Sequence, residues 1–74
     1  MQITYTEHAD ARMDFRKISK KEVEEAISQP YFTASSRLGR TIVVKKKGDK
    51  YLKIICDRSN DKITVVTVYW TRRP

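Results

Sequence analysis

Two helix signals follow one another in HADARMDFRKISKKEVEEAISQP, residues 8–30. In the second, Ser19 and Glu22 have the spacing of a capping box, in which each side chain satisfies a backbone N–H at the start of a helix. Pro30 ends this segment, because proline has no N–H to donate and its ring clashes with the preceding turn. We therefore expect a helix that begins after Ser19 and ends near Gln29.

The same segment has the apolar positions that a packed helix needs. Ile18 and Val23 stand on either side of the cap, at the positions of a hydrophobic staple. Val23, Ala26 and Ile27 recur at helical spacing and predict a buried stripe. Through that stripe the helix should pack on the rest of the core.

A shorter helix is expected from about Glu7 to Arg16, with Thr6 as its N-cap. His8, Arg12 and Arg16 follow one another at one-turn spacing, on the same broad side as the apolar residues of this helix. A guanidinium keeps its charge and is rarely buried alone. Arg12 therefore either meets a carboxylate inside the protein or lines a cleft for an anion.

The chain is small and basic, with 74 residues, 16 Lys and Arg against 9 Asp and Glu, and a formal net charge of +7. This length predicts one domain, residues 1–74, with a thin core. The charge predicts attraction to polyanions, acidic membrane surfaces or acidic proteins. Nucleic acid is the commonest such partner of a soluble domain.

Cys56 is the single cysteine and His8 the single histidine. A lone cysteine forms no intramolecular disulfide, and within the apolar run LKIIC it is expected to be buried, which favours a reducing compartment. The N-terminus has no basic region followed by an apolar segment, and no apolar run is long enough to span a membrane. We therefore expect a cytoplasmic protein without a cofactor, and without a structural metal, because structural zinc usually takes four ligands.

After Pro30 the sequence becomes rich in β-branched and aromatic residues, with turn signals at Gly39, at Gly48 and around Asn60. Four strands are expected, at residues 31–35, 40–47, 50–57 and 62–71. Short connections make neighbouring strands antiparallel. The predicted fold class is α+β, with two N-terminal helices packed on a three- to four-stranded antiparallel sheet.

Alternation divides the last two strands into two faces, and by itself it leaves open which face the helices cover. The expected core face contains Thr64, Val66, Val68 and Trp70 with Leu52, Ile54 and Cys56. The other face contains Ile63, Val65, Thr67 and Tyr69 with Tyr51, Lys53, Ile55 and Asp57. Lys45 and Val43 of the neighbouring strand are expected to join this second face. Its basic and aromatic residues would offer a surface to phosphates and bases.

His8 falls in the first turn of its helix, where the positive end of the helix dipole disfavours an imidazolium ion. A neutral histidine can accept a proton at pH 7, and Arg12 one turn later could hold a phosphate beside it. Arg16 extends this basic row by one more turn. The alternative is that His8 is an ordinary surface residue and that the arginines pair with Glu24, Glu25 or Asp57.

Tyr69 and Thr67 are two residues apart, so both hydroxyls could reach one cleft, as a proton donor and a hydrogen-bond anchor. The alternative is a central strand built from ordinary β-forming residues. The remaining candidates are basic residues that would contact phosphates, Lys45, Lys53, Arg72 and Arg73. For the lysines the alternative is a solubilising surface charge, and for the arginines a frayed tail.

Several of these features occur together in the order of a known family: an HAxxRM helix followed by an arginine, a capped second helix, a proline, and a final strand ITVVTVYW. In this chain they are His8, Ala9, Arg12, Met13, Arg16, Ile18, Ser19, Glu22, Val23, Pro30 and residues 63–70. The chain in this respect resembles a family of small bacterial and archaeal domains of unknown function. That family is similar in layout to the RelE-like toxins and to barnase-like, EndoU-like and colicin-like ribonucleases.

The resemblance implies a metal-independent endoribonuclease toxin that cleaves RNA by attack of the ribose 2′-OH and is held in check by an antitoxin, expected to be a small acidic protein. It implies catalytic roles for His8 and Arg12, and with them for Arg16 and Tyr69. RNA, free or on the ribosome, is then the expected partner. Two other interpretations stay open: a non-catalytic module that binds nucleic acid or the ribosome, and a module that binds an acidic protein.

Overall fold

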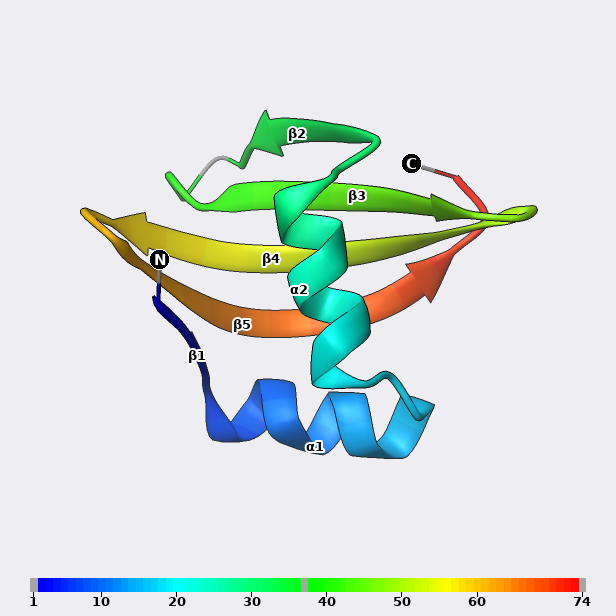
Figure 1. Ribbon diagram of the computed structural model, residues 1–74, viewed down its shortest axis with the longest axis horizontal. Helices are drawn as coiled ribbons and strands as arrows, with labels where there is room; N and C mark the ends of the chain where they lie inside the picture. Colours follow the sequence, from blue (N-terminus) through cyan, green and yellow to red (C-terminus); the bar gives the residue numbers. More distant parts are fainter. Residues whose placement is uncertain (1, 37, 74) are drawn as a thin grey trace.

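The computed structural model describes residues 2–36 and 38–73, which form one sheet and two helices (Figure 1). In chain order the elements are β1 (Gln2–Tyr5), α1 (Glu7–Arg16), α2 (Lys20–Ser28), β2 (Phe32–Ser35), β3 (Thr41–Lys47), β4 (Lys50–Ser59) and β5 (Lys62–Thr71). The strand order in the sheet is β1-β5-β4-β3-β2. Strand β1 runs parallel to β5, and the other neighbouring pairs are antiparallel.

The predicted sheet of three to four antiparallel strands behind two N-terminal helices is wrong, because the chain begins with a strand that pairs in parallel. Ile3 and Tyr5 alternate with Gln2 and Thr4, but four residues beside a helix cap are too few to stand out as a strand. A parallel pair needs a long crossover, and here the chain between β1 and β5 supplies it. The sheet is therefore mixed and has five strands.

The two helices take different positions on this sheet. Helix α2 crosses one face, whereas α1 lies along the edge formed by β5 and β1 (Figure 1). The expectation of two helices packed on the sheet is therefore corrected to one helix on a face and one at an edge. The opposite face of β2 to β5 carries neither helix, and we call it the open face.

Each helix begins at a side-chain cap. Thr6 Oγ1 accepts a hydrogen bond from Ala9 N–H at 3.0 Å and donates one to the Val66 carbonyl at 3.1 Å, which ties the start of α1 to β5. Ser19 Oγ accepts from Glu22 N–H at 3.1 Å, and Glu22 Oε1 accepts from Ser19 N–H at 3.1 Å. The predicted capping box is confirmed, and both helices lie where the sequence predicts them.

Replacing Ser19 with alanine should lower the free energy of unfolding by about 1 kcal/mol, because the Glu22 N–H loses its acceptor. Urea unfolding followed by circular dichroism measures this change. Ser28 is a matched control, since its hydroxyl donates only to carbonyls of its own helix. Ser28→Ala should change stability by less than about 0.5 kcal/mol. Equal losses in the two variants would contradict the capping role of Ser19.

A β-bulge in β5 decides which of its residues enter the core. Ile55 pairs with Thr67 and Cys56 pairs with Val65, so Val66 has no partner across the ladder between β4 and β5. One extra residue reverses the inward and outward alternation of the strand beyond it. A strict alternation along β5 therefore cannot describe both halves of the strand.

The bulge corrects the predicted faces of β5. The residues of β5 that contribute to the core are Ile63, Val65, Val68 and Trp70. Val68 and Trp70 were expected there, but Thr64 and Val66 lie outside the core. On β4 the predicted core residues Leu52, Ile54 and Cys56 are confirmed as buried.

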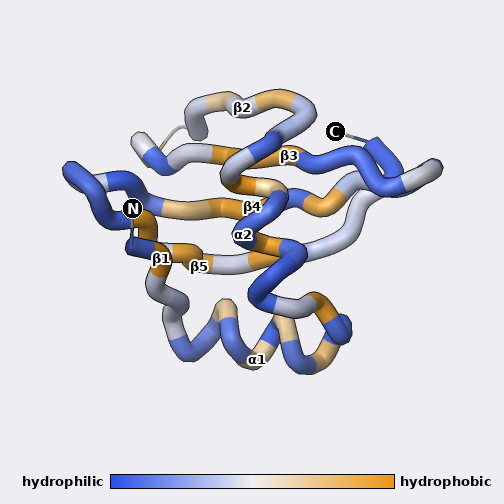
Figure 2. The backbone as a smooth tube through the Cα atoms, viewed as in Figure 1, coloured by the Kyte–Doolittle hydropathy of each residue, from blue (hydrophilic) through white to orange (hydrophobic). Residues whose placement is uncertain are grey.

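The core fills the space between the helices and the face of the sheet that α2 crosses. Its buried residues are Ala9, Met13, Ile18, Val23, Ala26, Ile27, Val43, Leu52, Ile54, Cys56, Ile63, Val65 and Val68. Figure 2 shows hydrophobic residues along the strands that α2 crosses, and mostly hydrophilic ones around the outside of α1. Burial raises the pKa of the Cys56 thiol, which is a free cysteine in the sheet.

Tyr5 brings a polar atom to the rim of this core. Its side chain packs against the core, and within the described residues its buried hydroxyl has no hydrogen-bond partner. Burial raises the pKa of Tyr5, and the negative charges of Glu24 and Asp10 raise it further. The Lys20 ammonium lies 5.1 Å from the centroid of the ring. The hydroxyl is thus held neutral among acidic neighbours.

Replacing Tyr5 with phenylalanine should raise the free energy of unfolding by about 1 kcal/mol, because a buried hydroxyl without a partner is removed. The variant should also lose less stability in alkali. A tyrosine whose pKa is higher in the folded chain than in the unfolded chain contributes to the free energy of unfolding. This contribution is complete below pH 10, the ordinary pKa, and it is lost as the pH rises through the pKa of the folded chain. Urea unfolding at neutral pH and above pH 10 tests both effects. A variant less stable than the wild type at every pH would contradict them.

Candidate nucleic-acid interface

The predicted His8 and Arg12 pair forms on the surface of α1. Arg12 Nε–H donates to His8 Nε2 at 3.4 Å, and both residues are exposed. An imidazole nitrogen that accepts a hydrogen bond carries no proton, so His8 can form this contact only through an unprotonated Nε2. A histidine and a permanent cation are therefore side by side.

This pair lies on the exposed part of α1, next to its buried residues. Ala9 and Met13 are the residues of α1 that enter the core. Side chains two residues apart on a helix point about 200° apart. Asp10 is two residues from both His8 and Arg12, so this carboxylate lies on the opposite flank of the helix from the pair.

Two of the three carboxylates expected to pair with the arginines are engaged elsewhere. Asp57 pairs with Arg40 at 3.3 Å, and Glu25 pairs with Lys47 at 3.4 Å. In the part of the chain that the structure describes, neither Arg12 nor Arg16 forms an ion pair. The prediction that Arg12 sits in the middle of an apolar side is also wrong, because Ala9 and Met13 are the buried residues of α1 and Arg12 is exposed beside them.

Cross-strand pairing defines the residues of the open face. One row runs from Phe32 through Val44 and Lys53 to Tyr69, a second from Ala34 through Ile42 and Ile55 to Thr67, and a third from Lys46 through Tyr51 to Thr71. The predicted residues Lys53, Thr67 and Tyr69 are therefore together on this face, each half-buried. The Lys53 ammonium lies 5.9 Å from the centroid of the Tyr69 ring.

Lys45 is a wrong prediction for this face. Its ammonium donates to the Gln29 carbonyl at 2.8 Å, at the end of α2, and the alternation of β3 places it with buried Val43 on the covered side. Lys46 takes its place on the open face, with its ammonium 5.9 Å from the centroid of the Tyr31 ring. The sequence contains three lysines in succession, at 45–47, and only the pairing register says which one faces outward.

Two aromatic residues of the open face were not predicted as site residues. Tyr31 lies with its ring centroid 5.8 Å from that of Phe32 and 5.8 Å from that of Tyr51. Their signal in the sequence is an adjacent pair of aromatic rings directly after Pro30, at the start of the edge strand. Such a pair is usually assigned to the core, but here the rings are 56% and 38% exposed.

The other predicted residues are not drawn into one cluster. Arg72 and Arg73 are exposed beyond the end of β5, where Thr71 Oγ1 accepts from the Arg73 backbone N–H at 3.2 Å. Arg16 is half-buried one turn after Arg12 on α1. The structure thus forms two pairs, His8 with Arg12 on α1, and Lys53 with Tyr69 on β4 and β5, and α1 packs against β5.

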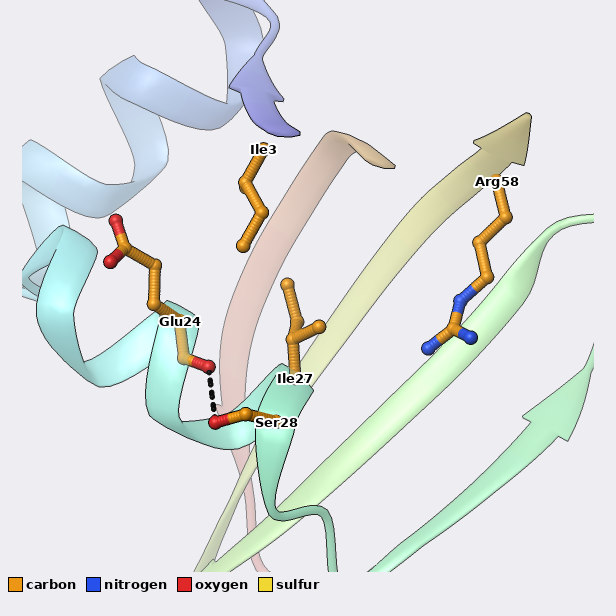
Figure 3. A pocket seen from close by; sticks show the side chains of 5 residues that line it. All are labelled: Ile3, Glu24, Ile27, Ser28 and Arg58. Carbon is orange, nitrogen blue, oxygen red and sulfur yellow. Dashed lines mark hydrogen bonds between the residues drawn. The ribbon is translucent and has the colours of Figure 1, made fainter. Parts of the chain in front are cut away.

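A hollow in the described surface lies on the other side of the sheet. It has a volume of about 480 Å³ and is lined by Ile3, Glu24, Ile27, Ser28 and Arg58. Figure 3 shows Ile3 and Ile27 in the middle, with the carboxylate of Glu24 and the guanidinium of Arg58 on opposite sides. None of the predicted site residues lines it.

Two further features are absent from residues 2–36 and 38–73. No helix there has the length and apolarity to cross a membrane. No group of three or more His, Cys, Asp or Glu side chains there is arranged to hold a metal ion.

Comparison with known proteins gives a family and no function. No curated protein and no solved structure matches the chain. The model of one family, described as a domain of unknown function (DUF4258), matches residues 5–70, from the last residue of β1 to near the end of β5. Because this match covers both helices and almost the whole sheet, the chain belongs to the DUF4258 family.

Proposed function

We propose that this protein cleaves RNA without a metal ion, with His8 as the base and Arg12 as the phosphate ligand. The observation that carries the proposal is the contact between His8 Nε2 and Arg12 Nε, with both side chains exposed on α1. An antitoxin would then be the physiological partner.

The proposed reaction needs a proton acceptor, a proton donor and cations around one phosphate. His8 removes the proton of the ribose 2′-OH, the 2′-oxygen forms a bond to phosphorus, and the bond from phosphorus to the 5′-oxygen breaks. The leaving oxygen takes a proton, for which the Tyr69 hydroxyl is the candidate donor. Arg12 and Arg16 stabilise the extra negative charge that the phosphate carries during these steps.

Arg12 has a second role in this scheme. In the free protein its Nε–H is bound to the nitrogen of His8 that would accept the proton. A phosphate that attracts the guanidinium draws this donor away, and His8 Nε2 becomes available as a base. Substrate binding and activation of the base are thereby the same event.

The test is incubation of the purified protein with labelled RNA in EDTA, followed by chemical analysis of the new ends. The proposal expects cyclic 2′,3′-phosphate and 5′-hydroxyl ends, because the attacking oxygen belongs to the RNA itself. Intact RNA, or cleavage that appears only when Mg²⁺ is added, would overturn it.

A non-catalytic module that binds nucleic acid is the second candidate. The observation that favours it is the set of rings and lysines on the open face, a type of surface that binds single strands without any reaction. The same incubation selects this candidate if the RNA is bound in a salt-dependent manner and its ends stay unchanged.

A further inference from the structure

Rings and ammonium groups lie side by side across the open face. Tyr69 on β5 pairs with Lys53 on β4. Tyr51 lies two residues before Lys53 on β4, and its side chain is on the same face. Tyr31 extends the group beyond β3, with its ring between those of Tyr51 and Phe32. Adjacent strands are about 4.8 Å apart, so these rings are spread over a strip several strands wide.

Acidic residues are separated from this strip. The carboxylates lie on α1 (Glu7, Asp10 and Asp14), on α2 (Glu22, Glu24 and Glu25), in turns (Asp49 and Asp61) and at the end of the open face (Asp57). The three on α1 are on the flank away from Arg12, and Asp57 is neutralised by Arg40. The open face therefore has a positive field in a chain whose net charge is +7.

We propose that the open face binds unpaired bases, so that the substrate class of this protein is single-stranded RNA. This inference rests on the proposed function for the choice of RNA. Bases stack on Tyr69, Tyr51 and Tyr31, and Lys53 and Lys46 contact the phosphates between them. Each lysine already lies 5.9 Å from the centroid of a ring, which places a cation next to the position of a stacked base.

The chemistry of the strip favours single strands over duplexes and acidic proteins. Every base has a flat surface that stacks on an aromatic ring, but in a duplex both surfaces are already covered by neighbouring base pairs. An acidic peptide would use the lysines and leave the rings without a matching group. A strand of RNA lying across β4 and β5 would continue toward the edge of the sheet where α1 lies (Figure 1), the helix that carries His8 and Arg12.

The test is fluorescence anisotropy with a labelled 2′-O-methyl oligouridine of about eight nucleotides, a length within the range that one such surface binds. This probe has no free 2′-OH, so its binding is measured without cleavage. We expect Tyr51→Ala and Tyr69→Ala each to weaken binding roughly 5- to 100-fold, and Tyr51→Phe and Tyr69→Phe to retain it. A duplex of the same length should bind at least about 10-fold more weakly than the single strand.

Lysine variants provide matched controls. Lys53→Ala and Lys46→Ala should weaken binding and reduce its dependence on salt, because each loses one phosphate contact. Lys21→Ala removes the same charge from the exposed surface of α2 and should leave the affinity nearly unchanged. Circular dichroism shows whether each variant remains folded. If an alanine variant does not fold, the phenylalanine variants are used in its place.

The outcomes separate this inference from the proposed function. If ordinary RNA is cleaved and the alanine variants bind the probe as well as the wild type does, the inference is overturned and the nuclease stands. If the tyrosines are needed for binding but ordinary RNA stays intact, the inference stands and the nuclease fails. Equal affinity for the duplex, or binding of polyglutamate in place of the probe, overturns the inference.

Discussion

Replacing His8 with alanine is expected to slow RNA cleavage by about 10²- to 10⁴-fold, the usual contribution of one general base. The side chain is exposed and forms only its contact with Arg12, so its removal leaves the core of α1 intact. The measurement is the rate of formation of cyclic 2′,3′-phosphate ends in EDTA under single-turnover conditions.

Other residues of the two helices provide the controls for this result. Arg12→Ala should slow cleavage by about 10²- to 10³-fold, because one charged contact to the reacting phosphate is lost. Lys21→Ala removes an exposed cation from the next helix, α2, and it should have little effect. A His8→Ala protein that cleaves at the wild-type rate would remove His8 from the mechanism.

The largest effect on stability is expected at Leu52. This residue of β4 is fully buried beneath α2, with strands paired on both sides of it. Leu52→Ala should lower the free energy of unfolding by about 2–5 kcal/mol, since the core loses apolar contacts and keeps a cavity. A domain of this size has only about 5–15 kcal/mol in total, so the variant should be close to its unfolding transition at room temperature.

Leu38 is the matched control for this prediction. It is the same residue type, but it is 81% exposed in the loop before β3. Leu38→Ala should change stability by less than about 0.5 kcal/mol. Urea unfolding of both variants, followed by circular dichroism and Trp70 fluorescence, provides the comparison. A loss below about 1 kcal/mol for Leu52→Ala would show that the core is not packed as described.

The helices could be predicted almost to the residue because their signals are local. A cap at Thr6, a capping box at Ser19 and a proline after α2 act within one or two turns, and so they are readable without the rest of the fold. The strand β1 could not be predicted in this way. It has four residues, and its pairing partner β5 is separated from it by almost the whole chain.

The sheet faces depend on pairing that the sequence does not display. A strict period of two fails at Val66, because a bulge is a property of two strands and not of one. The same reason explains the exchange of Lys45 for Lys46, since a shift of one residue moves every side chain of β3 to the other face.

One part of the candidate site could be predicted from local spacing, and another part depends on strand pairing. His8 and Arg12 are four residues apart on one helix, so their contact follows from helical spacing and was predicted. The group of Tyr31, Tyr51 and Lys53 joins two parts of the chain, strand β4 and the start of β2, through strand pairing. Local spacing could predict the pair on α1 and could not predict this group.

The central claim is that RNA binds on the open face and reaches the flank of α1 that carries His8 and Arg12. The most direct test is an NMR titration of the labelled protein with the 2′-O-methyl oligouridine. The account predicts that the largest chemical-shift changes occur at Lys53 and Tyr69 and at His8 and Arg12. Changes confined to α2 and to the hollow lined by Ile27 would contradict it.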